Sequence, residues 1–128
     1  MALVRRIGVV FGIAFTFGGI LGFVPWVIKD DMYLGIFRVN AAHNLLHLAS
    51  GALFFVASAI GARLTRWWLI LFGTLYAVMA GEGLKVGTGM ICGCISNNRA
   101  DAWGHAGLAT AMLLAGLLVP AAHERPAR

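Results

Sequence analysis

Long runs without charged residues divide this chain more clearly than any other feature of its sequence. No Asp, Glu, Lys or Arg occurs in residues 7–28, 39–62 or 102–123, and a further apolar run at 67–84 contains one acidic residue, Glu82. A helix needs about 20 predominantly apolar residues to cross the hydrocarbon core of a bilayer. Backbone groups in lipid must also be satisfied within their own segment. The runs therefore predict four membrane-spanning helices.

The predicted fold is an all-α integral membrane protein with a single domain over residues 1–128. We expect spans at about 7–28, 39–62, 67–85 and 101–121, with short loops between them. Hydrophobic residues make up 60% of the chain and charged residues only 12%, whereas soluble domains carry about 25% charged residues. This argues against a soluble enzyme and a disordered chain. The net charge of +5 does not indicate a nucleic-acid partner, because the basic residues lie at the edges of the apolar runs, as in membrane proteins.

The basic residues at the ends of the runs also predict an orientation. Loops on the cytoplasmic side of a membrane carry an excess of Lys and Arg. One side of the predicted fold has more of them: Arg5, Arg6, Arg63, Arg66, Arg125 and Arg128. The other side has fewer, together with three acids: Lys29, Arg38, Lys85, Arg99, Asp30, Asp31 and Asp101. We therefore expect a multi-pass protein with both termini in the cytoplasm and with the first span retained.

An internal repeat links the second and fourth predicted spans. Residues 40–47 read Asn-Ala-Ala-His-Asn-Leu-Leu-His, and residues 98–105 read Asn-Arg-Ala-Asp-Ala-Trp-Gly-His. The Asn, one Ala and the last His coincide. The chain is thus predicted to form two repeated helical hairpins that pack as a four-helix bundle, related by a pseudo-twofold axis along the membrane normal. Equivalent faces of the second and fourth spans would then point toward that axis.

These two helix openings, together with the Gly-Phe-Val-Pro segment at 22–25, resemble a widespread bacterial family of small four-helix membrane proteins. The family is catalogued as a domain of unknown function, and the resemblance covers nearly the whole chain. It implies a four-helix fold and a bacterial origin, hence the inner (cytoplasmic) membrane, and it supplies no activity. The chain differs from the family pattern at Ala102, where an Asn is usual, and the Cys-Gly-Cys loop and Glu82 look particular to this chain.

Two pairs of polar residues at i, i+4 spacing are the main candidates for chemistry. This spacing places both members of a pair on one helix face. Three imidazoles and a carboxylate suit zinc, copper or iron, and zinc or copper is the predicted cofactor. The predicted ligands, all in the outer half of the membrane, are His43, His47, Asp101 and His105. Glu82 is a candidate fifth ligand, or it orients the ligands or supports the structure together with Asn40 and Asn98.

A structural interpretation of the same residues stays open. Asn40 and Asn98 are good helix N-caps, and Asp101 is favourable in a first helical turn. The histidines would then hydrogen-bond across the helices as a clasp, and the protein would be an accessory subunit of a larger membrane complex or a homo-oligomer. A third interpretation has His47 and His105 bind a haem iron from opposite sides, although bulky residues near them argue against a haem slot.

The Cys92-Gly93-Cys94 segment also allows several interpretations. A disulfide across one residue would be strained and easily reduced, and so a redox element. Two thiolates would also capture a soft ion such as Cu(I), or both thiols are simply free. A quinone or thiol oxidoreductase would need a redox cofactor that the sequence does not specify, and no nucleophile–base pair or phosphate loop is present. The sequence thus favours a small non-enzymatic membrane protein that binds a transition metal.

Overall fold

The computed structural model describes residues 1–121, and residues 122–128, which include Arg125 and Arg128 of the predicted basic side, lie outside the described part. Within the described residues the chain forms four helices: α1 (Leu3–Leu21), α2 (Ala41–Ile60), α3 (Ala62–Val86) and α4 (Arg99–Leu118). Two small antiparallel sheets occupy the connections. The α1–α2 connection contains β1 (Ile28–Lys29), β2 (Met32–Tyr33) and β3 (Phe37–Arg38), and the α3–α4 connection contains β4 (Gly89–Ile91) and β5 (Ile95–Asn97).

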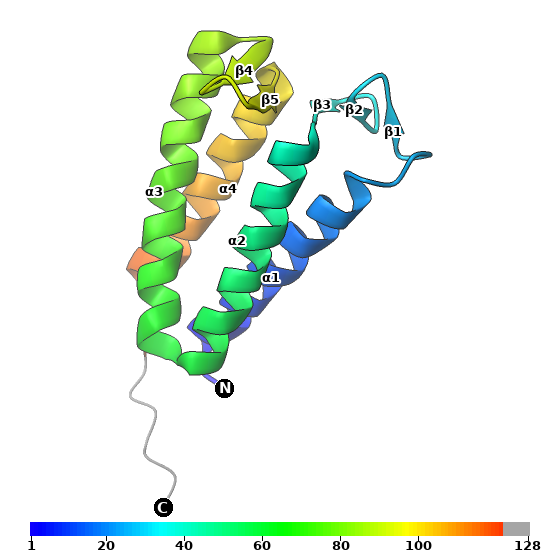
Figure 1. The fold of residues 1–128 in the computed structure, drawn as a ribbon. Coiled ribbons are helices and arrows are strands. Elements are labelled where there is room, and N and C mark those ends of the chain that lie inside the picture. Colours follow the sequence, from blue (N-terminus) through cyan, green and yellow to red (C-terminus); the bar gives the residue numbers. More distant parts are fainter. Residues whose placement is uncertain (122–128) are drawn as a thin grey trace, which may run out of the picture.

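The helices pack mainly in two pairs. α1 lies along α2 and α3 lies along α4, whereas α1 and α4 touch each other only slightly. Figure 1 shows both small sheets at one end of the molecule, with the N-terminus and the α2–α3 connection at the opposite end. The two connections that carry the sheets, and the first turns of α2 and α4 that follow them, therefore lie at the same end of the molecule.

Glycines allow α1 to approach α2 closely. A methyl group at Gly12 would lie 2.8 Å from the ring of Phe55, and one at Gly19 would lie 2.9 Å from the backbone oxygen of Asn44. Small residues at helix contacts are typical of packing in lipid. The glycine spacing in α1 thus serves contact with α2 in the same chain.

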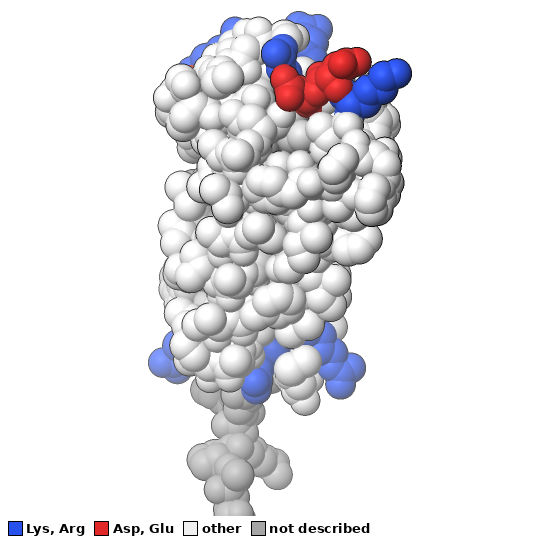
Figure 2. Space-filling view, turned by 45° about the vertical axis from the view of Figure 1, so that its right-hand side comes forward, with Lys and Arg blue, Asp and Glu red and all other residues white. Residues whose placement is uncertain are grey.

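Three of the helices in residues 1–121, namely α1, α2 and α3, are long and apolar enough to cross a membrane by length and composition. α4 does not meet the same criteria, since its first two turns carry Arg99, Asp101 and His105. On the face drawn in Figure 2, charged side chains gather at the two ends of the molecule with a broad uncharged band between them, and the acidic ones lie at one end only. This distribution fits a chain with several membrane-spanning helices.

The expectation of an entirely helical chain is incomplete because it omits the two sheets. Their strands are two or three residues long, too short to show the alternation by which strands are recognised. β4 and β5 are joined by Cys92, Gly93 and Cys94; Cys92 and Gly93 are in the left-handed region with φ of 51° and 72°, and the N–H of Cys94 donates to the Ile91 oxygen at 3.2 Å. Two such central residues form the turn type that matches the twist of a hairpin.

The first helix ends earlier than its apolar run. α1 stops at Leu21, although the sequence is free of charge to Ile28. Pro25 lacks a backbone N–H, and it disfavours a helical conformation in the residue before it. α3, in contrast, begins at Ala62 and includes Arg63 and Arg66 in its first turns, because only its middle part needs to be apolar.

Asn97 closes the carboxyl end of α3 and provides a test of the fold. Its buried side-chain amide donates to the backbone oxygens of Gly83 at 3.0 Å and Gly87 at 2.7 Å. The Gly83 oxygen also accepts the backbone N–H of Gly87 at 2.9 Å, and Gly87 follows the last residue of α3, where carbonyls lack the partners that a continuing helix would supply. We expect Asn97→Ala to lower the free energy of unfolding in detergent by about 2 kcal/mol. Thr110→Ala, which removes only a bond to the Ala106 oxygen on the same helix, should change it by less than about 0.5 kcal/mol. Equal effects of the two variants would contradict this role.

Candidate metal site

The N-terminus of α2 is fixed by Asn40. The side-chain oxygen of Asn40 accepts the backbone N–H of His43 at 2.9 Å, and its amide nitrogen donates to the Cys94 oxygen at 2.8 Å. The first contact is the N-cap that the sequence predicts, and the second ties the helix to the β4–β5 hairpin. Together they place His43 in the first turn of α2 and His47 one turn further along.

The N-terminus of α4 carries a capping box. The Asn98 side chain accepts the backbone N–H of Asp101 at 2.9 Å, while Oδ2 of Asp101 accepts the N–H of Asn98 at 2.8 Å. The same Oδ2 accepts the N–H of Arg38 at 2.9 Å, and the Asn98 amide donates to the Ile36 oxygen at 2.8 Å. The start of α4 is thus bound to β3, and His105 follows one turn after Asp101.

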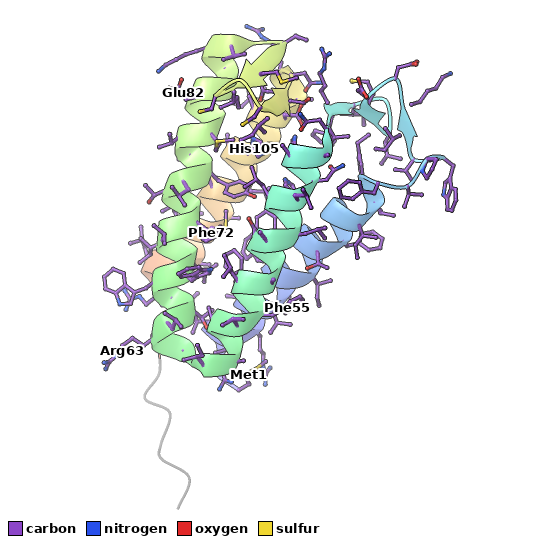
Figure 3. All side chains as sticks on the ribbon, in the orientation of Figure 1. Met1, Phe55, Arg63, Phe72, Glu82 and His105 are labelled. Carbon is purple, nitrogen blue, oxygen red and sulfur yellow. The ribbon has the colours of Figure 1, made fainter. Side chains whose placement is uncertain are left out.

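These two helix starts bring three imidazoles together. The ring centroids of His43 and His47 lie 5.0 Å apart, those of His43 and His105 lie 5.6 Å apart, and those of His47 and His105 lie 6.4 Å apart. One ring nitrogen from each residue lies within 4.8 Å of the other two. In Figure 3, His105 lies between the helices near the end that carries the sheets.

The hydrogen bonds of the three rings leave nitrogen atoms free. Nδ1 of His43 lies 3.1 Å from the backbone oxygen of Ser96. Because a carbonyl oxygen only accepts, Nδ1 carries the proton and the lone pair is on Nε2. Nε2 of His47 and Nδ1 of His105 are buried and have no hydrogen-bond partner within residues 1–121. Buried polar atoms usually have a partner, so these two nitrogens require an explanation.

Aromatic rings support the imidazoles on the side of the core. Phe15 meets the ring of His47 edge-on at 5.5 Å, and Tyr76 meets that of His105 edge-on at 5.3 Å. Phe15 and Tyr76 are themselves in contact at 5.1 Å between ring centroids. The packed rings restrict the orientations that the imidazoles can adopt.

A cavity of about 320 Å³ opens on the other side of the histidines. It is lined by all three imidazoles together with residues of α1, the segment from β2 to the start of α2, α2 and α4: Gly18, Tyr33, Phe37, Val39, Asn44, Asp101, Gly104 and Leu108. The three rings therefore present their edges to a space large enough for a small molecule.

The other residues singled out by the sequence lie elsewhere or serve the fold. Asp101 is outside the group of three ligand atoms, and its Oδ2 holds two backbone N–H groups. Glu82 forms an ion pair with Lys85 at 2.7 Å and is 46% exposed, at the outer edge of α3 in Figure 3. Cys92 and Cys94 are free and exposed. Of the predicted set, the structure thus brings together the three histidines.

Some contributors to the site, among them Ser96 and Tyr76, were not identified from the sequence. Ser96 acts through its backbone oxygen, which no side-chain pattern reveals. Tyr76 is one of several aromatic residues on α3, and its contact with His105 depends on how α3 packs against α4. The only signal for Tyr76 is its place on an apolar helix, which it shares with many residues.

Comparison with known proteins identifies a family without identifying an activity. A family model described as Domain of unknown function (DUF4383) matches residues 5–118. No curated protein and no solved structure matches the chain. Any functional conclusion therefore depends on the geometry of the site.

Proposed function

Since the chain belongs to the DUF4383 family, for which no activity is described, we propose from the site itself that this small membrane protein binds one transition-metal ion, zinc or copper. The ligands are one nitrogen each from His43, His47 and His105. The observation that carries the proposal is the pair of buried, unpartnered ring nitrogens on His47 and His105 beside a third imidazole.

The hydrogen bond of His43 supports this assignment. Histidines that bind metals almost always donate their other N–H to a carboxylate, a backbone carbonyl or water, which fixes the tautomer and the ring orientation. The contact from Nδ1 of His43 to the Ser96 oxygen is of this kind. It leaves Nε2 as the nitrogen that would bind the ion.

The polar contacts favour the metal site over the histidine clasp, the two interpretations that the sequence left open. The hydrogen bonds that join the loops to the helix starts come from Asn40, Asn98 and Asp101. A histidine clasp would instead have its ring nitrogens paired across the helices. These contacts support a clasp formed by Asn40, Asn98 and Asp101, and they favour the histidines as the residues that would bind the ion.

The geometry suits a single ion with an open coordination position. Three protein ligands plus one exchangeable position are typical of zinc sites that react with or bind small molecules. Nitrogens bound at about 2.0–2.1 Å in a tetrahedron lie about 3.3 Å apart, so binding draws the imidazoles closer than the 4.8 Å limit of the present group. The ring centroid of His43 lies 5.0 Å from that of His47 and 5.6 Å from that of His105. This proximity of a third imidazole favours an ion bound by three histidines over a haem bound by two.

We also propose that α4 crosses the membrane with the other three helices. It packs along α3, and its outward side exposes large apolar residues, among them Leu114, Leu117 and Leu118. Its Arg99 and Asp101 lie in the first turn, at the level of the loops. In a four-helix membrane bundle, the two ends of α4 would lie at the same depths in the membrane as the neighbouring ends of α3.

Equivalent contacts in the two hairpins support the predicted repeat. Arg5 donates to the oxygen of Ser58 near the end of α2, and Arg66 donates to the oxygen of Gly116 near the end of α4, at 2.7 Å and 2.8 Å.

At the other end, Asn44 donates to the Gly22 oxygen at 2.6 Å, and Asn97 does the same for Gly83. The repeat position equivalent to Asn44 is Ala102, so Asn97 supplies the amide that this chain lacks there. Both hairpins would thus keep a bond from an asparagine amide to a glycine oxygen, although the asparagine comes from a different position in the second hairpin.

The proposed location is a bacterial inner membrane with the sheets outside and the chain ends in the cytoplasm. Arg5, Arg6, Arg63 and Arg66 all lie in the first turns of α1 and α3, where the positive-inside rule places them. We expect a membrane-impermeant maleimide to label Cys92 and Cys94 in intact cells.

Arg63→Cys in a chain with both native cysteines changed to serine provides the matched control. It should react only after the cells are permeabilised. The reverse pattern would overturn the orientation and place the histidines in the inner half of the membrane.

Elemental analysis of the protein purified in mild detergent tests the metal proposal. We expect close to one zinc or copper per chain, and a chain that takes up neither ion would contradict it. Association with a larger complex or a second copy is a separate prediction, tested by co-purification at fixed stoichiometry.

A further inference from the structure

We propose that the cavity beside the histidines admits a neutral, lipid-soluble phenolic ligand whose oxygen takes the open position on the metal. This inference rests on the proposed metal site and adds to it the class of molecule that the site would bind. It follows from where the cavity opens, what lines it and which charges it lacks.

The cavity is bordered by both α1 and α4, and the proposed route of the ligand passes between these two helices. Its lining includes Gly18 of α1 and Gly104 of α4, and these two helices barely touch. A methyl group at Gly104 would already be 3.4 Å from the ring of Phe37, and one at Gly18 would be 3.6 Å from Nδ1 of His47. The two glycines therefore keep a passage open that larger side chains would fill. With α1 and α4 both in the bilayer, this passage faces lipid rather than water.

The lining favours a flat apolar ring. Tyr33, Phe37, Val39 and Leu108 supply apolar and aromatic surface, and aromatic rings pack well edge-on or offset against one another. The volume of about 320 Å³ is at the lower end of the range of about 300–1,000 Å³ for small-molecule sites. A single substituted ring with an alkyl tail leaving between α1 and α4 matches this shape.

The charges around the cavity exclude an anionic headgroup. No Lys or Arg is among its lining residues in the described part of the chain. The one acidic side chain, Asp101, already accepts two backbone N–H groups through Oδ2. A phosphate would therefore meet no cation except the metal, whereas a phenol needs only one oxygen ligand position. On binding, the phenol O–H bond would break and the oxygen would take the place of a hydroxide on the metal, so that the proton leaves with that hydroxide as water.

Loading the protein with copper(II) allows binding of the phenol oxygen to be followed by absorption spectroscopy. Three imidazoles bind Cu(II) more tightly than other divalent first-row ions, and a phenolate bound to Cu(II) gives a ligand-to-metal charge-transfer band in the visible spectrum. We expect 4-octylphenol to produce such a band in copper-loaded protein in detergent. Octylbenzene, which has the same tail and ring but no oxygen, should produce none.

Two variants of α4 provide the structural control. Gly104→Leu fills the passage next to Phe37 and should weaken octylphenol binding by at least about tenfold, the effect of about 1.4 kcal/mol, with copper content unchanged. Gly107→Leu adds the same side chain at an exposed position outside the cavity, where a methyl group meets nothing within 4 Å, and should bind like the natural chain.

The outcomes separate this inference from the proposed function. Copper bound without a phenolate band overturns the inference and leaves the metal site standing. A band that survives Gly104→Leu shows that the phenol does not use this cavity, and also overturns it. A chain that binds no copper overturns the proposed function and the inference together.

Discussion

Replacing His47 and His105 together with alanine should abolish stoichiometric metal binding. Both ligands lost in this variant have buried ring nitrogens without a hydrogen-bond partner. A partner that only orients a metal ligand already contributes about 10–100-fold to affinity, so loss of two ligands should weaken zinc binding by well over about 100-fold. The measurement is a competition titration with a chromogenic chelator, on protein purified in the same detergent.

Two further variants identify the source of any residual binding. Cys92→Ser/Cys94→Ser and Glu82→Gln should both keep the affinity of the natural chain, because the two thiols and the Glu82–Lys85 pair are exposed and lie outside the histidine group. If the double cysteine variant lost the metal while the double histidine variant kept it, the ion would be held by the β4–β5 hairpin instead.

Asp101→Ala should give the largest loss of stability of any single polar substitution in this region. The substitution removes the acceptor for the N–H groups of Asn98 and Arg38, at 2.8 Å and 2.9 Å, and so loosens both the start of α4 and its bond to β3. Hydrogen bonds to a charged group contribute about 1.5–3 kcal/mol each. We expect the free energy of unfolding in detergent to fall by at least about 3 kcal/mol.

Asp101→Asn separates a structural role from a ligand role. An amide oxygen still accepts both N–H groups without the charge, so the loss of stability should be about half that of Asp101→Ala. Metal affinity should stay within about threefold of the natural chain, less than the effect of even an orienting partner of a ligand. Loss of the metal in Asp101→Asn, in a protein that remains folded, would show that the carboxylate is a ligand as the sequence first indicated.

Most of the features that could be predicted from the sequence followed from the apolar runs and from the i, i+4 spacings. The runs indicated where the helices lie, because the length of an apolar segment can be counted directly along the sequence. The spacing of His43 and His47 fixed a shared helix face for the same reason. Asn40 and Asn98 were recognisable as N-caps because capping involves residues only three positions apart.

The parts that could not be predicted depend on contacts between distant segments. Asp101 occupies the repeat position of His43, and both side chains could bind a metal; the capping box of Asp101 with Asn98 is local, but the contacts that fix each side chain to a loop are not. The difference arises because the N–H of Arg38 reaches Asp101 across 63 positions of sequence, whereas His43 meets the oxygen of Ser96 across 53. The lengths of the α1–α2 and α3–α4 connections, and the turns within them, determine which loop residue contacts Asp101 and which contacts His43.

X-ray absorption spectroscopy of the chain loaded with one equivalent of zinc tests the central claim most directly. We expect nitrogen scatterers at about 2.0–2.1 Å with the outer-shell pattern of about three imidazoles and no sulfur. A sulfur shell at about 2.3 Å, or a spectrum without imidazole contributions, would contradict a site formed by His43, His47 and His105.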